Sequence, residues 1–156
     1  MRAHDVRLQA AGFRFAVVAS RFNEQITDEL LEGALQCLKS HEAEEDLIDV
    51  FRVPGAFEIP MTVARVAATG RFDAIITIGA LVRGETAHFD HISSQVTHAI
   101  SAVAVDLGVP VSFGVITCET MEQAFARSST GANKGWEAAL AAIEMVNLWK
   151  EIERTV

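Results

Sequence analysis

Tyrosine is absent from this sequence of 156 residues, and aromatic residues of all kinds make up only 7% of it. Hydrophobic residues nevertheless account for 50%, so the core must be filled mainly by Val, Ile, Leu and Ala. A chain of this length and composition is expected to bury a substantial core in one domain. No linker, repeat or low-complexity segment interrupts it. We therefore expect residues 1–156 to form a single domain, with residues 1–11 as a flexible or partner-contacting arm.

Basic residues are scarce compared with acidic ones, at 13 Lys and Arg against 21 Asp and Glu, which gives a formal net charge of -8. Nucleic-acid binding needs a basic face, so this balance argues against a nucleic-acid partner. An anionic small molecule is still a suitable ligand, because a pocket can be locally positive on an acidic protein.

Long apolar runs are missing too, and the first residues, MRAHDVRLQAAG, contain no apolar signal core. The sequence therefore predicts no membrane segment and a cytoplasmic location. The two cysteines, Cys37 and Cys118, have no spacing typical of a metal or redox site, and we expect both to be reduced and packed.

The sequence does contain four short apolar runs, each followed by a helical pattern. The runs cover 13–20, 46–53, 72–80 and 109–117. The helical patterns cover about 26–38, 60–68, 89–107, 120–127 and 133–153. Runs without polar alternation are typical of strands covered on both faces, and strand–helix alternation is typical of a parallel sheet. We therefore predict a three-layer α/β/α sandwich with a four-stranded parallel sheet.

Polar segments follow the predicted strands, at the edge of a parallel sheet where ligands commonly bind. They read SRFNE (20–24), VPGAFEIP (53–60), GALVRGETAHFDH (79–91) and ITCET (116–120). The third segment is unusual because it concentrates charged and titratable side chains within nine residues. This composition favours a functional site over an ordinary turn.

Three interpretations of the third segment are open. His88, Asp90 and His91 are metal-ligand types, but their spacing is too short for convergence on one ion, so we expect no metal. His88 is instead suited to acid–base chemistry, because imidazole titrates near neutral pH. A purely structural His88 is the remaining alternative.

Other segments suggest a phosphate and an aromatic ligand. Residues 83–86 form a predicted glycine-containing turn near the start of a helix. This turn either binds an anion or simply connects the strand to the helix. Phe22 is either a stacking platform or a core aromatic, and Glu58 is either a hydroxyl acceptor or an acid at a helix start. Arg127 and Lys134 flank a flexible loop and suit a phosphate, with a solvated helix connection as the alternative.

Five stretches resemble the lumazine synthase family in sequence, order and spacing. They are SRFNE, VPGAFEIP, GALVRGETAHFDHI, VPVSFGVITCETMEQA and NKGWEAA, and the resemblance extends over about 12–150. It implies a flavodoxin-like fold and a condensation of 5-amino-6-(D-ribitylamino)uracil with 3,4-dihydroxy-2-butanone 4-phosphate, without a metal or other cofactor. The product is 6,7-dimethyl-8-ribityllumazine, and the reaction is the penultimate step of riboflavin biosynthesis.

For the pyrimidine substrate, the resemblance implies roles for residues on three strand ends. Phe22 stacks on the ring. Ala56 and Glu58 hold the ribityl chain, and Leu81 and Val82 present backbone atoms to the uracil edge.

For the second substrate, the resemblance implies a phosphate site lined by Gly84, Glu85 and Thr86, with Arg127 as its main cation. His88 moves protons. The pocket is completed by Lys134, Glu137 and, from a neighbouring subunit, Phe113.

The resemblance also implies partners. The chain is expected to form a homopentamer or an assembly of pentamers, and riboflavin synthase is a candidate macromolecular partner. Two features differ from many family members: the 129–133 loop is shorter and lacks a lysine, and His91 stands where an aromatic is common. Two rival functions are a flavodoxin-like module that binds a flavin without turnover and a purely structural shell protein.

Overall fold

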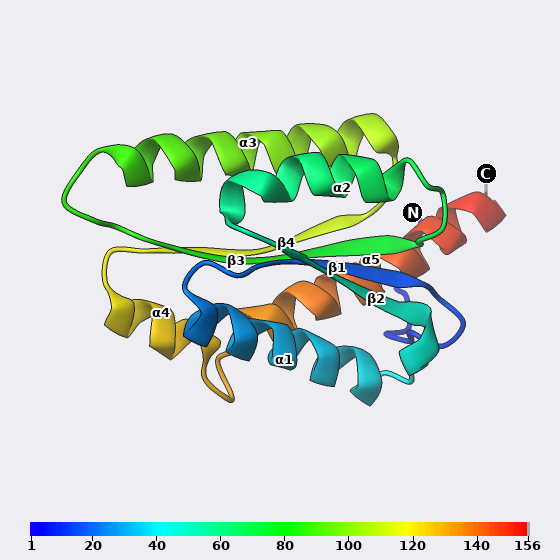
Figure 1. The fold of residues 1–156 in the computed structure, drawn as a ribbon. Helices are drawn as coiled ribbons and strands as arrows, with labels where there is room; N and C mark the ends of the chain where they lie inside the picture. Colours follow the sequence, from blue (N-terminus) through cyan, green and yellow to red (C-terminus); the bar gives the residue numbers. More distant parts are fainter. Residues whose placement is uncertain (156) are drawn as a thin grey trace.

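A four-stranded parallel sheet with strand order β2-β1-β3-β4 forms the centre of the computed structural model, which describes residues 1–155 (Figure 1). The strands are β1 Phe15–Ser20, β2 Ile48–Val53, β3 Ala74–Val82 and β4 Val111–Cys118. Every pairing is parallel. The predicted number and direction of strands are therefore confirmed.

Helices cover both faces of this sheet (Figure 1). On one face lie α1 Glu24–Ser40, α4 Met121–Ser128 and α5 Lys134–Thr155. On the other lie α2 Ile59–Ala67 and α3 His88–Leu107. The structure is thus the predicted three-layer sandwich.

The central strands explain why the apolar runs show no alternation. All six residues of β1 are buried. Phe15 and Val17 pack on the side of α1 and α5, whereas Ala16 and Val18 pack on the side of α2 and α3. A strand that is covered on both faces needs apolar residues at every position.

Some predicted boundaries were wrong by two residues. β3 continues to Val82, beyond the predicted end at 80, because Leu81 and Val82 still pair with Thr117 and Cys118 of β4. β2 begins only at Ile48, since Glu45–Leu47 forms a 3-10 turn. The extension of β3 carries the chain further towards the polar edge of the sheet.

The cysteine and helix-end predictions are confirmed. Cys37 and Cys118 are both buried free thiols, and burial raises the pKa of Cys37 to about 11. α3 ends at Leu107, where Gly108 takes a left-handed conformation with φ 63° that glycine adopts without steric cost.

The start of the chain lies against its own α1 and α5. The backbone N–H of Ala10 donates to the carbonyl of His41 at 2.8 Å, and the Asn147 amide donates to the Gln9 carbonyl at 2.8 Å. His4 and Glu151 side chains meet at 3.1 Å. None of the helices in residues 1–155 has the length and apolarity needed to cross a membrane.

Candidate active site

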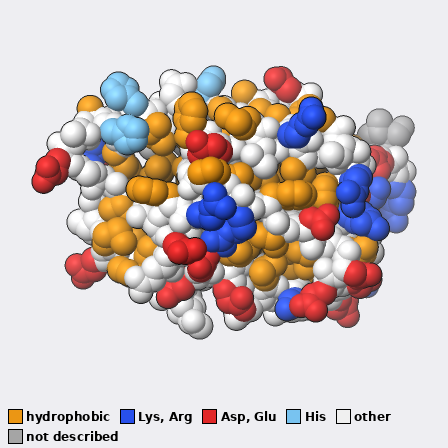
Figure 2. All heavy atoms as spheres, in the orientation of Figure 1, with side chains coloured by type: hydrophobic (Ala, Val, Ile, Leu, Met, Phe, Trp, Pro, Cys, Tyr) orange, Lys and Arg blue, Asp and Glu red, His pale blue; other side chains and the backbone are white. Residues whose placement is uncertain are grey.

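A cavity of about 340 Å³ lies where β1, β2 and β3 end and α3 begins. Its wall contains Phe22, the 55–57 turn, Leu81 with Val82, and part of the 84–92 segment. Histidine side chains gather over the start of α3 on the molecular surface, with hydrophobic side chains beside them (Figure 2). The polar edge predicted from the sequence is therefore a hollow with a partly apolar lining.

Phe22 stands at the rim of this cavity with 66% of its surface exposed. Two backbone bonds to the end of β2 fix its position: Arg21 N–H donates to the Val53 carbonyl at 2.8 Å, and Phe22 N–H to that of Pro54 at 3.1 Å. The Asn23 amide donates to the Ala80 carbonyl at 2.9 Å. An exposed ring on a backbone that these bonds hold in place is suited to stacking, and the alternative of a core aromatic is wrong.

The turn after β2 brings another aromatic residue to the cavity. Ala56 is buried in the wall, and Phe57 lines it with 56% of its surface exposed. Phe57 was missed by sequence reasoning, although its place between Ala56 and Glu58 in a polar strand end was a usable signal. Glu58 lies outside the lining, and its carboxylate accepts the Gly55 N–H at 2.9 Å, as expected of an acid at a helix start.

The loop after β3 carries the imidazole. His88 is the first residue of α3 and lines the cavity together with Gly84 and Thr86. The Thr86 hydroxyl accepts the His88 N–H at 3.3 Å. Glu85 is exposed and is not part of the lining. A helix N-terminus beside an exposed imidazole can both bind an anion and transfer a proton.

The acids around His88 do not form a metal site. Both carboxylate oxygens of Asp90 accept from the Arg83 guanidinium at 2.9 Å. Within residues 1–155, no three His, Cys, Asp or Glu side chains are placed to hold a metal ion.

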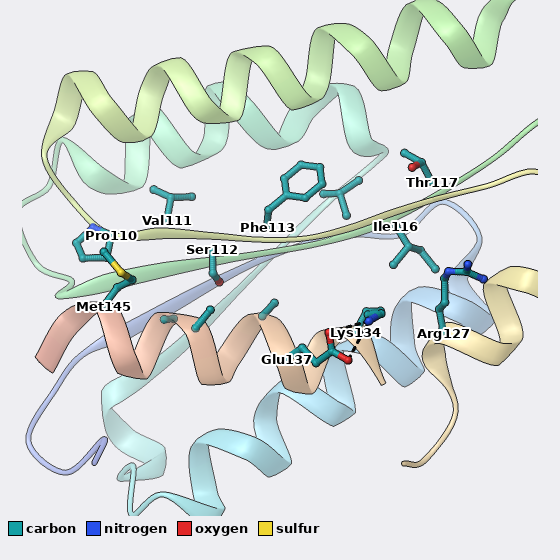
Figure 3. Close-up of a pocket in the computed structure, with 14 residues that line it drawn as sticks. Pro110, Val111, Ser112, Phe113, Ile116, Thr117, Arg127, Lys134, Glu137 and Met145 are labelled. Carbon is teal, nitrogen blue, oxygen red and sulfur yellow. Dashed lines mark hydrogen bonds and ion pairs between the residues drawn. The ribbon is translucent and has the colours of Figure 1, made fainter. Parts of the chain in front are cut away.

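A second cavity, of about 600 Å³, lies along the free edge of β4 (Figure 3). Phe113 of β4 extends from the strand on the α3 side, with 46% of its surface exposed. Arg127 reaches the cavity from α4, and Lys134 and Glu137 reach it from α5. Residues far apart in the sequence thus form one surface.

The cations of this second cavity differ in availability. Lys134 is neutralised by Glu137, with Nζ at 2.9 and 2.8 Å from the two carboxylate oxygens. The Arg127 guanidinium donates to the Gln123 carbonyl at 3.1 Å. Among the side chains of residues 1–155 it forms no ion pair, so its charge is available to an anion.

Asn133 holds the start of α5 and was not recognised in the sequence. Its amide donates to the carbonyls of Glu29 at 2.8 Å and Ser128 at 2.6 Å. Its side-chain oxygen accepts the N–H groups of Gly135 at 2.8 Å and Trp136 at 3.1 Å. Because this residue ties the end of α4 to the start of α5, it fixes the segments that carry the two cations.

The two cavities have no lining residue in common. The first contains these residues expected at the site: Phe22, Ala56, Leu81, Val82, Gly84, Thr86 and His88. The second contains the others, except for Glu58 and Glu85: Phe113, Arg127, Lys134 and Glu137. On a single chain, therefore, the structure does not bring His88 and Arg127 to the same cavity.

Comparison with known proteins agrees with this arrangement of motifs. Residues 12–150 match the family described as 6,7-dimethyl-8-ribityllumazine synthase. A protein of that name from Chloroherpeton thalassium is 51% identical over 146 residues, which cover 93% of this chain and 94% of the relative.

Proposed function

The chain belongs to the 6,7-dimethyl-8-ribityllumazine synthase family, and on that premise we propose that it condenses 5-amino-6-(D-ribitylamino)uracil with 3,4-dihydroxy-2-butanone 4-phosphate. The lumazine, phosphate and water are the products, in the penultimate step of riboflavin biosynthesis. The observation that carries the proposal is the pair of separate cavities, one with the exposed Phe22 ring and the His88 imidazole and the other with the Arg127 guanidinium, which has no carboxylate partner within residues 1–155.

The first cavity suits the pyrimidine substrate. Phe22 offers an open ring face for stacking on the uracil. Leu81 and Val82 lie at the end of β3, where backbone groups can hydrogen-bond to the uracil edge. Ala56 and Glu58 would receive the ribityl chain, with the Glu58 carboxylate accepting a hydroxyl in addition to the Gly55 N–H.

The phosphate is assigned to Arg127 together with the loop of Gly84, Glu85 and Thr86. A guanidinium can bind two phosphate oxygens at once, and Arg127 has no carboxylate partner in residues 1–155 that competes for it. Lys134 and Glu137 form a neutral pair beside it, so they orient polar groups without adding net charge.

Proton transfer is assigned to His88. The 5-amino group adds to the substrate ketone, and loss of water gives an imine. Removal of a proton next to the imine carbon expels phosphate from the neighbouring carbon. After tautomerisation, the ribitylamino nitrogen adds to the new carbonyl, and loss of a second water closes the ring. An imidazole near neutral pH can serve each of these transfers, and holding both substrates together lowers the remaining barrier.

We propose that one chain supplies the first cavity and its neighbour supplies the second. The separate cavities support this arrangement, since each carries only half of the required groups. Both surfaces expose large apolar side chains suited to an interface, Phe22 and Phe57 at the first cavity and Phe113 at the second. A ring of five chains is the proposed minimum, and riboflavin synthase is the proposed partner that takes up the product.

α3 provides only limited support for the ring. Val96 and Ile100 are buried within the chain, and the other apolar residues on this side of the helix, Ile92, Ala99, Val103 and Ala104, are half-buried. Val105, near the end of the helix, is 81% exposed. The helix therefore uses one apolar face inside its own chain and leaves an apolar end for a neighbour.

Light scattering combined with a fluorescence assay for the lumazine tests this proposal. We expect product to form only in fractions whose mass is at least five times that of the 16.9 kDa chain, because an isolated chain lacks a complete site. A mass of sixty chains would indicate a closed shell. An active species of 16.9 kDa would rule out the shared site.

A further inference from the structure

Arg83 joins three segments at the edge of the first cavity without lining either cavity. Its Nη1 and Nη2 donate to the two oxygens of Asp90, each at 2.9 Å, and its Nε donates to Glu119 at 2.6 Å. Its backbone N–H donates to the Cys118 carbonyl at 2.9 Å. The end of β3, the first turn of α3 and the segment after β4 are thereby connected.

The loop enclosed by this connection has few other attachments. Residues 84–87 are exposed. Within residues 1–155, their hydrogen bonds reach only His88, through the Thr86 hydroxyl, and His91, through the Ala87 carbonyl. A β-carbon added to Gly84 would have no atom within 4 Å. The Arg83–Asp90 pair therefore closes a loop that otherwise has little to hold it in place.

The geometry of the Arg83 contacts is restrictive. The guanidinium is planar and binds Asp90 through two parallel hydrogen bonds, and its carbon also lies 4.5 Å from the centre of the Phe89 ring. Hydrogen bonding to Arg83 lowers the pKa of Asp90, so the pair stays charged at neutral pH. An isolated ion pair at the surface contributes little stability and barely restrains its two side chains, but a bidentate pair within a network restrains both partners.

We propose that Arg83 is a positioning residue, which fixes the first turn of α3 and hence the imidazole of His88. This inference rests on the proposed function, in which His88 transfers protons. Arg83 acts through Asp90, two residues after His88, and does not touch the substrates.

The test compares Arg83→Met with Arg71→Met in steady-state kinetics. Arg71 precedes the opposite end of β3 and makes weaker contacts of the same two kinds, with its guanidinium carbon 5.7 Å from the Phe72 ring and an ion pair with Asp49 at 3.9 Å. We expect R83M to lower kcat about tenfold, because His88 is misplaced. The KM for the butanone phosphate should rise only about twofold, since Arg127 remains as its main cation although the 84–86 loop is less restrained, and the KM for the pyrimidine substrate should stay unchanged. R71M should keep the activity of the parent chain.

Two further variants separate positioning from a general loss of structure. R83K keeps the charge but cannot reproduce the bidentate contact, so only part of kcat should return. D90N should lower kcat as R83M does, because it removes the other half of the same ion pair. The double variant R83M/D90N should therefore lose less kcat than the product of the two single fold losses, since both changes break one connection. Thermal unfolding of R83M should stay close to that of the parent chain, because its partners Asp90 and Glu119 are exposed and surface ion pairs contribute little to stability.

The controls also distinguish this inference from the function on which it rests. If H88A loses turnover while R83M and D90N match R71M in kcat, the positioning role is wrong and the proposed function stands. If R83M raises the KM values without lowering kcat, the positioning role is again wrong. If H88A keeps full turnover, the proposed function itself fails.

Discussion

Replacing His88 with alanine should lower kcat by roughly ten- to a thousandfold, while both KM values change much less. The imidazole begins α3 at the wall of the first cavity, where the amine and ketone are proposed to react. Water can transfer some of the protons, which is why the loss should stop short of complete inactivation. Binding should persist because Phe22 and Arg127 are unchanged.

Formation of the fluorescent lumazine from both substrates between pH 6 and 8 measures this effect. His91→Ala is the matched control, since His91 is also an exposed imidazole in the first turn of α3 but lies outside the cavity. Retention of full turnover by H88A throughout this pH range would remove the acid–base assignment.

Replacing Arg127 with alanine should raise the KM for the butanone phosphate about ten- to a hundredfold, the cost of losing a charge-assisted hydrogen bond to an anion. The KM for the pyrimidine substrate should barely change, because its proposed contacts lie in the other cavity. Arg127→Lys should restore only part of the affinity, since an ammonium group lacks the bidentate geometry.

The matched control is Arg154→Ala, which removes an exposed guanidinium from the last turn of α5, away from both cavities. Initial rates measured while each substrate is varied in turn give the two KM values separately. An equal rise in both KM values would show that the α4–α5 connection had collapsed, and it would remove the phosphate assignment.

The fold was predictable because its central strands are apolar on both faces and a helical pattern follows each strand. Errors arose at the strand ends, where pairing between β3 and β4 decides how far each strand continues. The sequence pattern around Leu81 and Val82 reads equally well as strand or loop. Only the register with Thr117 and Cys118 assigns both residues to the strand.

The residue types of the site were predictable from the sequence, but the separation of these residues into two cavities was not. The carboxyl ends of parallel strands meet at one edge, which places Phe22 and His88 together. The position of Arg127 depends instead on how α4 and α5 pack beside β4, and that packing has no local sequence signal. Asn133 has one partner on α1, Glu29, about a hundred residues away, and that contact has no local signal. Its bonds with the N–H groups of Gly135 and Trp136 are local, and Asn before a helical pattern was a usable signal for them.

Mixing the H88A and R127A chains tests the shared site most directly. The two variants are unfolded together, refolded in equal amounts and assayed at a limiting concentration of the butanone phosphate, where each alone is nearly inactive. If every site takes its first cavity from one chain and its second from a neighbour, random assembly gives about one quarter of sites with both halves intact. We therefore predict recovery of about one quarter of the activity of the unmodified protein. Activity no higher than the average of the two separate variants would contradict the shared site.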